Sequence, residues 1–196
     1  MRKFIIVLSL VAPIAMVAWV ASHSSVTKSE KKQGTLSSAE LIKRGEYLVS
    51  TIGCDDCHSP KKMGPMGPEI IPELRLSGYP SGRPLQRPDS HVVKQGWILF
   101  GQDLTSAVGP WGVSFAANIT SDPTGIGNWK EEQFIKALRE GKWKGLDNSR
   151  PLLPPMPWFV YKNMADDDLK SIFAFLKSTR PVENLVPAPK KLSDLK

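Results

Sequence analysis

The sequence predicts an all-α domain, because three amphipathic segments are separated by one long stretch rich in proline and glycine. Apolar residues recur at helical spacing within residues 37–52, 129–141 and 166–178. Residues 59–128 hold 9 of the 17 prolines and 10 of the 15 glycines, and they show no sustained periodicity. With 196 residues, 41% of them hydrophobic, the chain is long enough for one domain with a buried core. We therefore expect a helical domain that carries a long Pro/Gly-rich insertion.

The first residues of the chain have the layout of an export signal. Arg2 and Lys3 are followed by an uncharged apolar run over residues 4–21 and then by a serine-rich stretch. This order is typical of a secretory signal, and the apolar run is also long enough to cross a bilayer. We expect export to the periplasm, with residues 1–23 as either a signal peptide or an N-terminal membrane anchor. Residues 24–36 then form a linker to the domain.

The chain is basic, with a formal net charge of +7. A basic surface raises the rate of encounter with acidic partners, although ordinary solubility explains such a charge equally well. The lysines and arginines are scattered, and no nucleic-acid recognition motif accompanies them. Together with the expected export, this pattern argues against nucleic acid as a partner.

The first helix is expected to begin at Ser37. Ser37 and Glu40 fit a capping box, in which the hydroxyl and the carboxylate each satisfy a free backbone N–H. Four residues then share one face of the helix: Leu41, Gly45, Leu48 and Ile52. Because glycine costs about 1 kcal/mol in a helix interior, Gly45 indicates a close crossing with a second helix.

The two later helices follow the same logic. Residues 129–141 are expected to form a helix capped by Asn128 and Glu131, and residues 166–178 a helix that Pro181 terminates. The buried stripes are Phe134, Ile135 and Leu138 in the first, and Leu169, Ile172, Phe173 and Leu176 in the second. The domain would thus cover residues 37–181, followed by a loose C-terminal tail over residues 182–196.

The insertion over residues 59–128 is expected to be mostly irregular, with short strands or helical turns, for example around residues 92–100. A loop of this length is unusual in a compact domain unless something organises it. A large buried cofactor would provide that organisation.

The two cysteines carry the strongest chemical signal in the chain. Cys54 and Cys57 are too close in sequence to staple the fold by a disulfide, and His58 follows them directly. Two thiols three positions apart on a helix can both reach the vinyl groups of one haem, and the adjacent histidine is then held beneath the iron. This spacing is the attachment signature of c-type haem. We therefore predict one covalently bound haem c, attached to Cys54 and Cys57, with His58 as an axial iron ligand.

Two other chemistries use similar cysteine pairs. A thioredoxin-like redox pair needs a βαβ setting, which the predicted elements do not provide. A zinc knuckle needs further cysteine or histidine ligands, and only His23 and His91 remain. Both alternatives are therefore weaker than haem attachment.

At this point the chain resembles the class I c-type cytochromes over roughly residues 37–181. The resemblance rests on the first helix leading into Cys54–His58, on a methionine-bearing loop, and on the last helix. Residues 117–129 and 155–158 also resemble haem modules of cytochrome subunits in bacterial membrane dehydrogenases. Those subunits usually carry several haem motifs, whereas this chain carries one. The resemblance implies a class I cytochrome c-like fold, in which the first and last helices cross.

The resemblance also indicates the second axial ligand. Class I cytochromes place a methionine ligand in a loop before the last helix, and Met156 stands in such a loop, flanked by prolines. Met63 and Met66 follow His58 too closely to reach the opposite side of a haem, and Met164 is equally suited to core packing. His91 is the alternative ligand, since histidine binds haem iron well. We therefore assign His58 and Met156 as the iron ligands.

Residues around the motifs suggest supporting roles. A backbone carbonyl at Gly64-Pro65 or Gly67-Pro68 is expected to accept a hydrogen bond from the His58 ring and orient it. Five lysines flank the motifs and form either a docking patch or an ordinary solvated surface: Lys61, Lys62, Lys142, Lys144 and Lys162.

The expected function is one-electron transfer rather than catalysis. With both axial positions filled, substrate does not bind the iron, and electrons are exchanged with separate redox proteins. A membrane dehydrogenase or a terminal oxidase is the expected kind of partner, and a retained N-terminal anchor would tether the protein to the membrane. A haem enzyme with an open sixth position and a haem-free thiol module are the alternatives.

Overall fold

The computed structural model describes residues 36–194, in which helices account for 37% and strands for 13%. The all-α prediction is therefore wrong, because the insertion contains two small sheets. The expected signal or anchor (1–23) and nearly all of the linker (24–36) lie outside the described residues. Within residues 36–194 no helix combines the length and apolar character that a membrane crossing requires.

The first helix begins where the sequence predicts it. Helix α2 (Ser38–Thr51) has Ser37 as its N-cap residue. The backbone N–H of Ser37 donates to the Glu40 carboxylate at 2.8 Å, and that of Glu40 donates to the Ser37 hydroxyl at 3.4 Å. Both halves of the predicted capping box are present, so the start of the helix is encoded locally.

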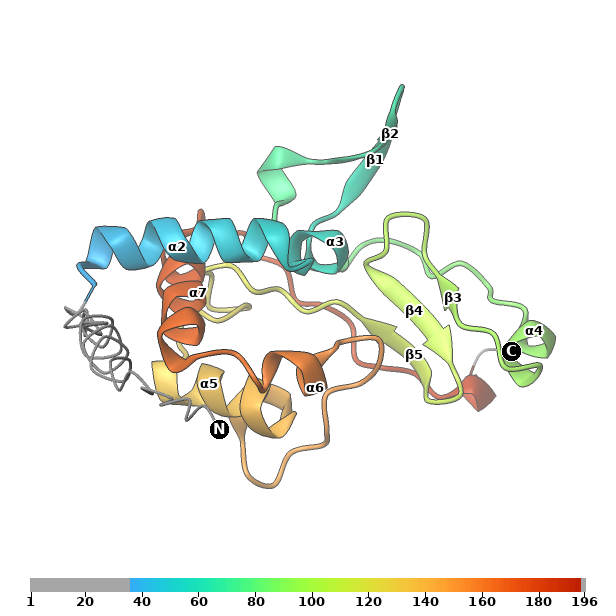
Figure 1. The fold of residues 1–196 in the computed structure, drawn as a ribbon. Coiled ribbons are helices and arrows are strands. Elements are labelled where there is room, and N and C mark those ends of the chain that lie inside the picture. The colour runs from blue at the N-terminus through green and yellow to red at the C-terminus, as the bar shows by residue number, and fades with distance from the viewer. Residues whose placement is uncertain (1–35, 195–196) are drawn as a thin grey trace, which may run out of the picture. The chain divides into compact units, whose positions relative to one another are not determined.

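Helix α2 crosses helix α7 (Asp166–Ser178) at very short range (Figure 1). A Cβ atom placed on Gly45 would lie 1.9 Å from the backbone oxygen of Ser171. Only glycine permits this approach, which confirms the close crossing predicted from Gly45. The whole predicted stripe of α7 is buried, which supplies the apolar surface that holds the crossing together.

A third long helix, α5 (Glu131–Glu140), begins two residues later than predicted. Its N-cap residue is Lys130, which makes no side-chain capping bond, so the predicted Asn128 cap is wrong. The helix ends at Glu140, where the C-cap residue Gly141 has a φ of 65°, and the short helix α6 (Trp158–Tyr161) follows later in the chain. A single-turn 3₁₀ helix, η2 (Trp143–Gly145), lies in the connection between them.

One hydrophobic core joins these helices. Phe134 of α5 and Phe173 of α7 stack at a centroid distance of 5.4 Å. The buried members of this core, which we call the main core, come from helices α2, α5 and α7 and from two loops: Leu48, Val49, Leu76, Ile126, Phe134, Leu138, Leu169, Ile172, Phe173, Phe175 and Leu176. Leu76 and Ile126 belong to the insertion, which therefore contributes to the core rather than only looping around it.

The insertion folds into two antiparallel sheets. The first is a hairpin of β1 (Lys61–Gly64) and β2 (Gly67–Ile70), followed by the 3₁₀ turn η1 (Pro72–Leu74). The second has the order β3-β4-β5, and a short helix, α4, precedes it (Figure 1). Their bounds are Ser90–Lys94 for α4, Leu99–Phe100 for β3, Ser106–Gly109 for β4 and Gly112–Phe115 for β5. Short strands or helical turns were expected in the insertion, for example around residues 92–100, where α4 and β3 lie. Strands of two to four residues leave no periodic pattern, which is why the sequence did not place the two sheets.

The residues after α7, for which we expect a loose tail, are instead bound along the domain. The buried Asn184 side chain donates to the backbone oxygens of Ser77 and Tyr79 at 2.7 and 3.0 Å. Lys190 pairs with Val113 of β5, and the 3₁₀ turn η3 (Leu192–Asp194) follows. Residues 182–194 thus hold the insertion against the helical part of the domain.

Candidate functional site

The Cys-x-x-Cys-His segment forms a helix of its own, α3 (Cys54–His58). Gly53 separates it from α2 by adopting a φ of 89°, a conformation that side chains other than glycine rarely take. Because Cys54 and Cys57 are three positions apart on a helix, they lie on the same side, one turn apart. Both thiols are free, and both side chains are half-buried.

The thiols lie in surroundings that keep them neutral. Burial, assisted by the charge of Asp55, raises the pKa of the Cys54 thiol to about 12. Burial and the charge of Asp56 also raise the pKa of the Cys57 thiol. Reactive cysteine pairs of the thioredoxin type need the opposite shift, toward the thiolate. Both pKa shifts found here run in the other direction.

The ring of His58 is oriented by the insertion. Its Nδ1 atom lies 2.7 Å from the backbone oxygen of Ala117, which can only accept a hydrogen bond, so Nδ1 is the donor. This leaves Nε2 as the basic nitrogen, and burial lowers the pKa of the ring, which favours the neutral form that binds metals. The prediction that a carbonyl of Gly64-Pro65 or Gly67-Pro68 accepts this hydrogen bond is wrong. Those residues form the β1–β2 hairpin instead.

A buried carboxylate anchors α3 from within the motif. Asp55 accepts hydrogen bonds from the Arg75 guanidinium at 2.8–3.3 Å and from the Ser59 hydroxyl at 2.7 Å. The same Ser59 oxygen accepts from the backbone N–H of Leu76 at 2.9 Å. Arg75 also lies over the Phe175 ring of α7, 5.6 Å from its centre. This network, which the sequence analysis did not identify, connects the motif to the insertion and to the last helix.

Met156 lies in the loop before the last helices. Its side chain is half-buried and contacts the main core, as does Cys54. The loop is fixed to the end of α2 by Tyr161, whose hydroxyl donates to the backbone oxygen of Ile52 at 2.8 Å. Periodicity alone gave no reason to single out Tyr161.

The other candidate ligands lie elsewhere. Met63 and Met66 are on the β1–β2 hairpin, with 62% and 97% of their surfaces exposed. Met164 packs against the main core. His91 is exposed on α4, on the far side of the three-stranded sheet from α3 (Figure 1).

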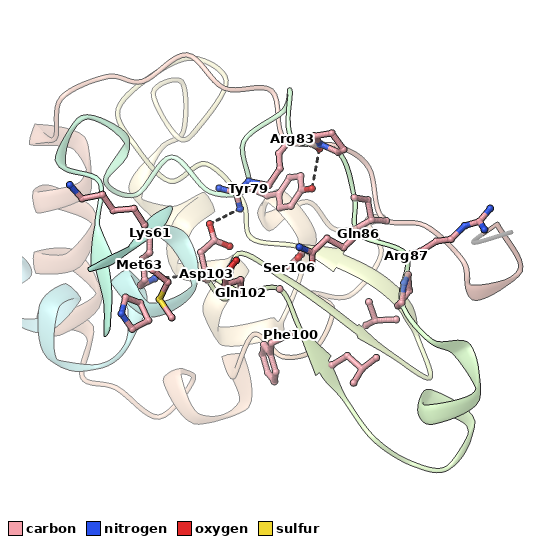
Figure 2. Close-up of a pocket in the computed structure, with 18 of the residues that line it drawn as sticks. Lys61, Met63, Tyr79, Arg83, Gln86, Arg87, Phe100, Gln102, Asp103 and Ser106 are labelled. Atoms are coloured by element: carbon pink, nitrogen blue, oxygen red, sulfur yellow. Dashed lines mark hydrogen bonds and ion pairs between the residues drawn. The ribbon is translucent and has the colours of Figure 1, made fainter. Parts of the chain in front are cut away.

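The insertion also builds a groove of about 560 Å³ next to β1 (Figure 2). Arg83 and the buried Asp103 form an ion pair of 2.6 Å there, and the Tyr79 hydroxyl donates to the Arg83 backbone oxygen at 3.0 Å. In the described part of the chain, no buried side-chain nitrogen or oxygen lacks a hydrogen-bond partner. The buried polar groups of the groove are therefore satisfied by the protein itself.

Taken together, the residues around α3 suit a covalently attached haem. Two unpaired thiols one turn apart and an imidazole with a basic Nε2 match the attachment residues and the first iron ligand of a c-type haem, for which Met156 is the candidate second ligand. In residues 36–194 no three His, Cys, Asp or Glu side chains converge as a metal-binding group. The zinc alternative therefore lacks a ligand set in this region.

Comparison with known proteins points in the same direction. The chain is 30% identical over 151 residues to the cytochrome c subunit of the quinone-type alcohol dehydrogenase of Gluconobacter oxydans. It is 31% identical over 144 residues to the gluconate 2-dehydrogenase cytochrome c subunit of Pantoea cypripedii. The matches cover 76% and 72% of this chain, but only 24% of each relative.

A third similarity is shorter. The chain is 39% identical to a nicotinate dehydrogenase subunit of Pseudomonas putida over 80 residues, which are 40% of this chain and 6% of that protein. No family model matches the chain. The cytochrome c relatives support a c-type cytochrome involved in electron transfer, and they imply covalently bound haem c.

Proposed function

We propose that this protein is an exported, mono-haem c-type cytochrome that transfers one electron at a time between redox partners. The haem is attached through Cys54 and Cys57, and its iron is bound by His58 and Met156. The observation that carries this proposal is helix α3, which presents two free thiols and an imidazole whose Nδ1 donates to Ala117.

The haem supplies a reversible one-electron couple, and the protein supplies its attachment and surroundings. Cys54 and Cys57 would hold the group through two thioether links. Ala117 keeps His58 in the tautomer that offers Nε2, and Tyr161 keeps the Met156 loop against the end of α2. If the chain fills both ligand positions of the iron, no position would remain for substrate, and the protein would act as a carrier rather than as an enzyme.

The proposed partner is a dehydrogenase, which would donate electrons to this protein. A terminal oxidase is the alternative partner, and it would accept electrons from this protein. The relatives are named as cytochrome subunits of dehydrogenases for alcohol, gluconate and fructose. The chain spans about a quarter of their length, so their substrates do not transfer to it.

The direct test is maturation of the full chain in the periplasm of a bacterium that attaches c-type haem. We expect a coloured protein whose oxidised and reduced absorption spectra differ, and whose denatured mass exceeds that of the polypeptide by one haem. A colourless protein of polypeptide mass would overturn the proposal.

Replacing Met156 by alanine tests the second axial ligand. Because the sulfur is removed, we expect the iron to become high-spin and the reduced protein to bind carbon monoxide readily. Met164→Ala is the matched control, since Met164 is also half-buried against the main core. Absorption spectra with and without carbon monoxide measure both effects. If the unsubstituted protein already binds carbon monoxide readily, the haem enzyme with an open site becomes the better function.

A further inference from the structure

The side chain of Lys61, which follows the motif by three residues, is directed to backbone oxygens around the end of α3. Its ammonium lies 3.1 Å from the backbone oxygen of Asp55, 2.6 Å from that of Asp56 and 2.9 Å from that of Ser59. A fourth contact, at 3.3 Å, reaches the backbone oxygen of Asp103. Lys61 is therefore half-buried and held by the protein, rather than part of a solvated patch.

These contacts provide a hydrogen-bond donor for carbonyl groups of α3. The last carbonyl groups of any helix lack partners within the helix, and a cation is favoured there by the helix dipole. Since α3 has only five residues, one ammonium reaches two of its five carbonyl groups.

The fourth contact connects the motif to the insertion. Asp103 lies 42 positions from Lys61 in the sequence. Its carboxylate is fixed by Arg83 at 2.6 Å and by the Thr105 hydroxyl at 2.7 Å, in the groove of Figure 2. Lys61 thus joins α3 to a part of the insertion that is itself rigidly held.

The charge of Lys61 also lies close to the two cysteines. Its ammonium is within 3.1 Å of the backbone oxygens of Asp55 and Asp56, the two residues that stand between Cys54 and Cys57. A cation held at this position lies close to any group that the two cysteines carry. Since the reduced haem carries one positive charge less than the oxidised haem, a nearby cation favours reduction.

We propose that Lys61 is a positioning residue for the haem: it fixes α3 against the insertion and, through its charge, raises the reduction potential. The inference rests on the proposed function, because it concerns a haem attached to α3. It also gives part of the Pro/Gly-rich insertion a role, which is to provide Asp103 as a support for the attachment helix.

The test compares Lys61→Met with Lys62→Met. Lys62 is the adjacent residue of β1, its side chain is exposed, and its replacement changes the net charge equally. We expect a lower midpoint potential in K61M than in the unsubstituted protein and K62M. We also expect about tenfold faster amide hydrogen exchange in residues 54–60, because hydrogen bonds to an ammonium are lost. K61R, which keeps the charge, should recover most of the potential.

Equal shifts of the potential in K61M and K62M, or unchanged exchange in residues 54–60, would overturn the inference. If K61M does not retain haem, K61Q is compared with K62M in its place. The glutamine amide also lacks the charge, but it can still donate a hydrogen bond to one carbonyl. The unsubstituted protein is measured first: if it lacks haem, the proposed function itself fails. If it carries haem and K61M behaves like K62M, only the role of Lys61 is rejected.

Discussion

Replacing both Cys54 and Cys57 by serine is expected to abolish covalent haem attachment completely. A hydroxyl does not form the thioether link, so the denatured variant should have the mass of the polypeptide alone. Each single variant keeps one sulfur and should hold less haem than the unsubstituted protein. Mass spectrometry after denaturation and the absorbance of the purified protein measure these outcomes.

The fold should tolerate the serine substitutions. Both thiols are neutral at ordinary pH because burial raises their pKa, and neither forms a disulfide. Serine is therefore a neutral replacement of similar size, and the helical circular dichroism of the haem-free protein should be retained. A double variant that still carries haem after denaturation would contradict attachment through these residues.

Replacing Gly45 by alanine is expected to destabilise the domain by about 3 kcal/mol, the upper part of the usual range for overpacking. The added Cβ would lie 1.9 Å from the Ser171 backbone oxygen and 2.7 Å from the Phe175 Cβ, so the α2–α7 crossing must separate. Alanine favours the helix by about 1 kcal/mol relative to glycine, which offsets only part of the clash. Since whole domains are stable by about 5–15 kcal/mol, the loss is a large fraction.

Gly82→Ala is the matched control for this prediction. A Cβ on Gly82 meets no atom within 4 Å, so the same chemical change occurs without a clash. The free energy of unfolding, measured by denaturant titration of both haem-loaded variants, should fall for G45A and remain nearly unchanged for G82A. Equal values for the two variants would mean that the helix crossing is not as tight as the structure places it.

Features that depend on neighbouring residues were predictable from the sequence. The capping box of Ser37 and Glu40 was predicted and is present, and helix α7 has the predicted bounds. In the candidate site, the attachment motif was recognisable because its chemistry depends on a fixed spacing of three residues. The close crossing at Gly45 was predictable because an unfavourable residue in a helix needs a structural reason.

Features that depend on distant parts of the chain were not predictable in this way. The sequence analysis expected short strands in the insertion but did not locate the two sheets, because each strand is stabilised by its partner strand rather than by a pattern of its own. For the same reason, the Gly-Pro pairs near His58 seemed suitable acceptors, although Ala117, 59 positions away, accepts the hydrogen bond.

By itself, the sequence determined two of the three long-helix starts and the apolar faces, and it contained the Cys54, Cys57 and His58 spacing on which the proposed haem attachment rests. These features depend on side-chain chemistry within one or two helical turns. Only the tertiary structure decided which backbone oxygen orients His58, where Lys61 donates, and that residues 182–194 bind along the domain. Backbone carbonyls are chemically alike at every residue, so the residue types alone do not reveal which carbonyl a distant side chain will contact. That choice is made by packing, which brings segments far apart in the chain to hydrogen-bonding distance.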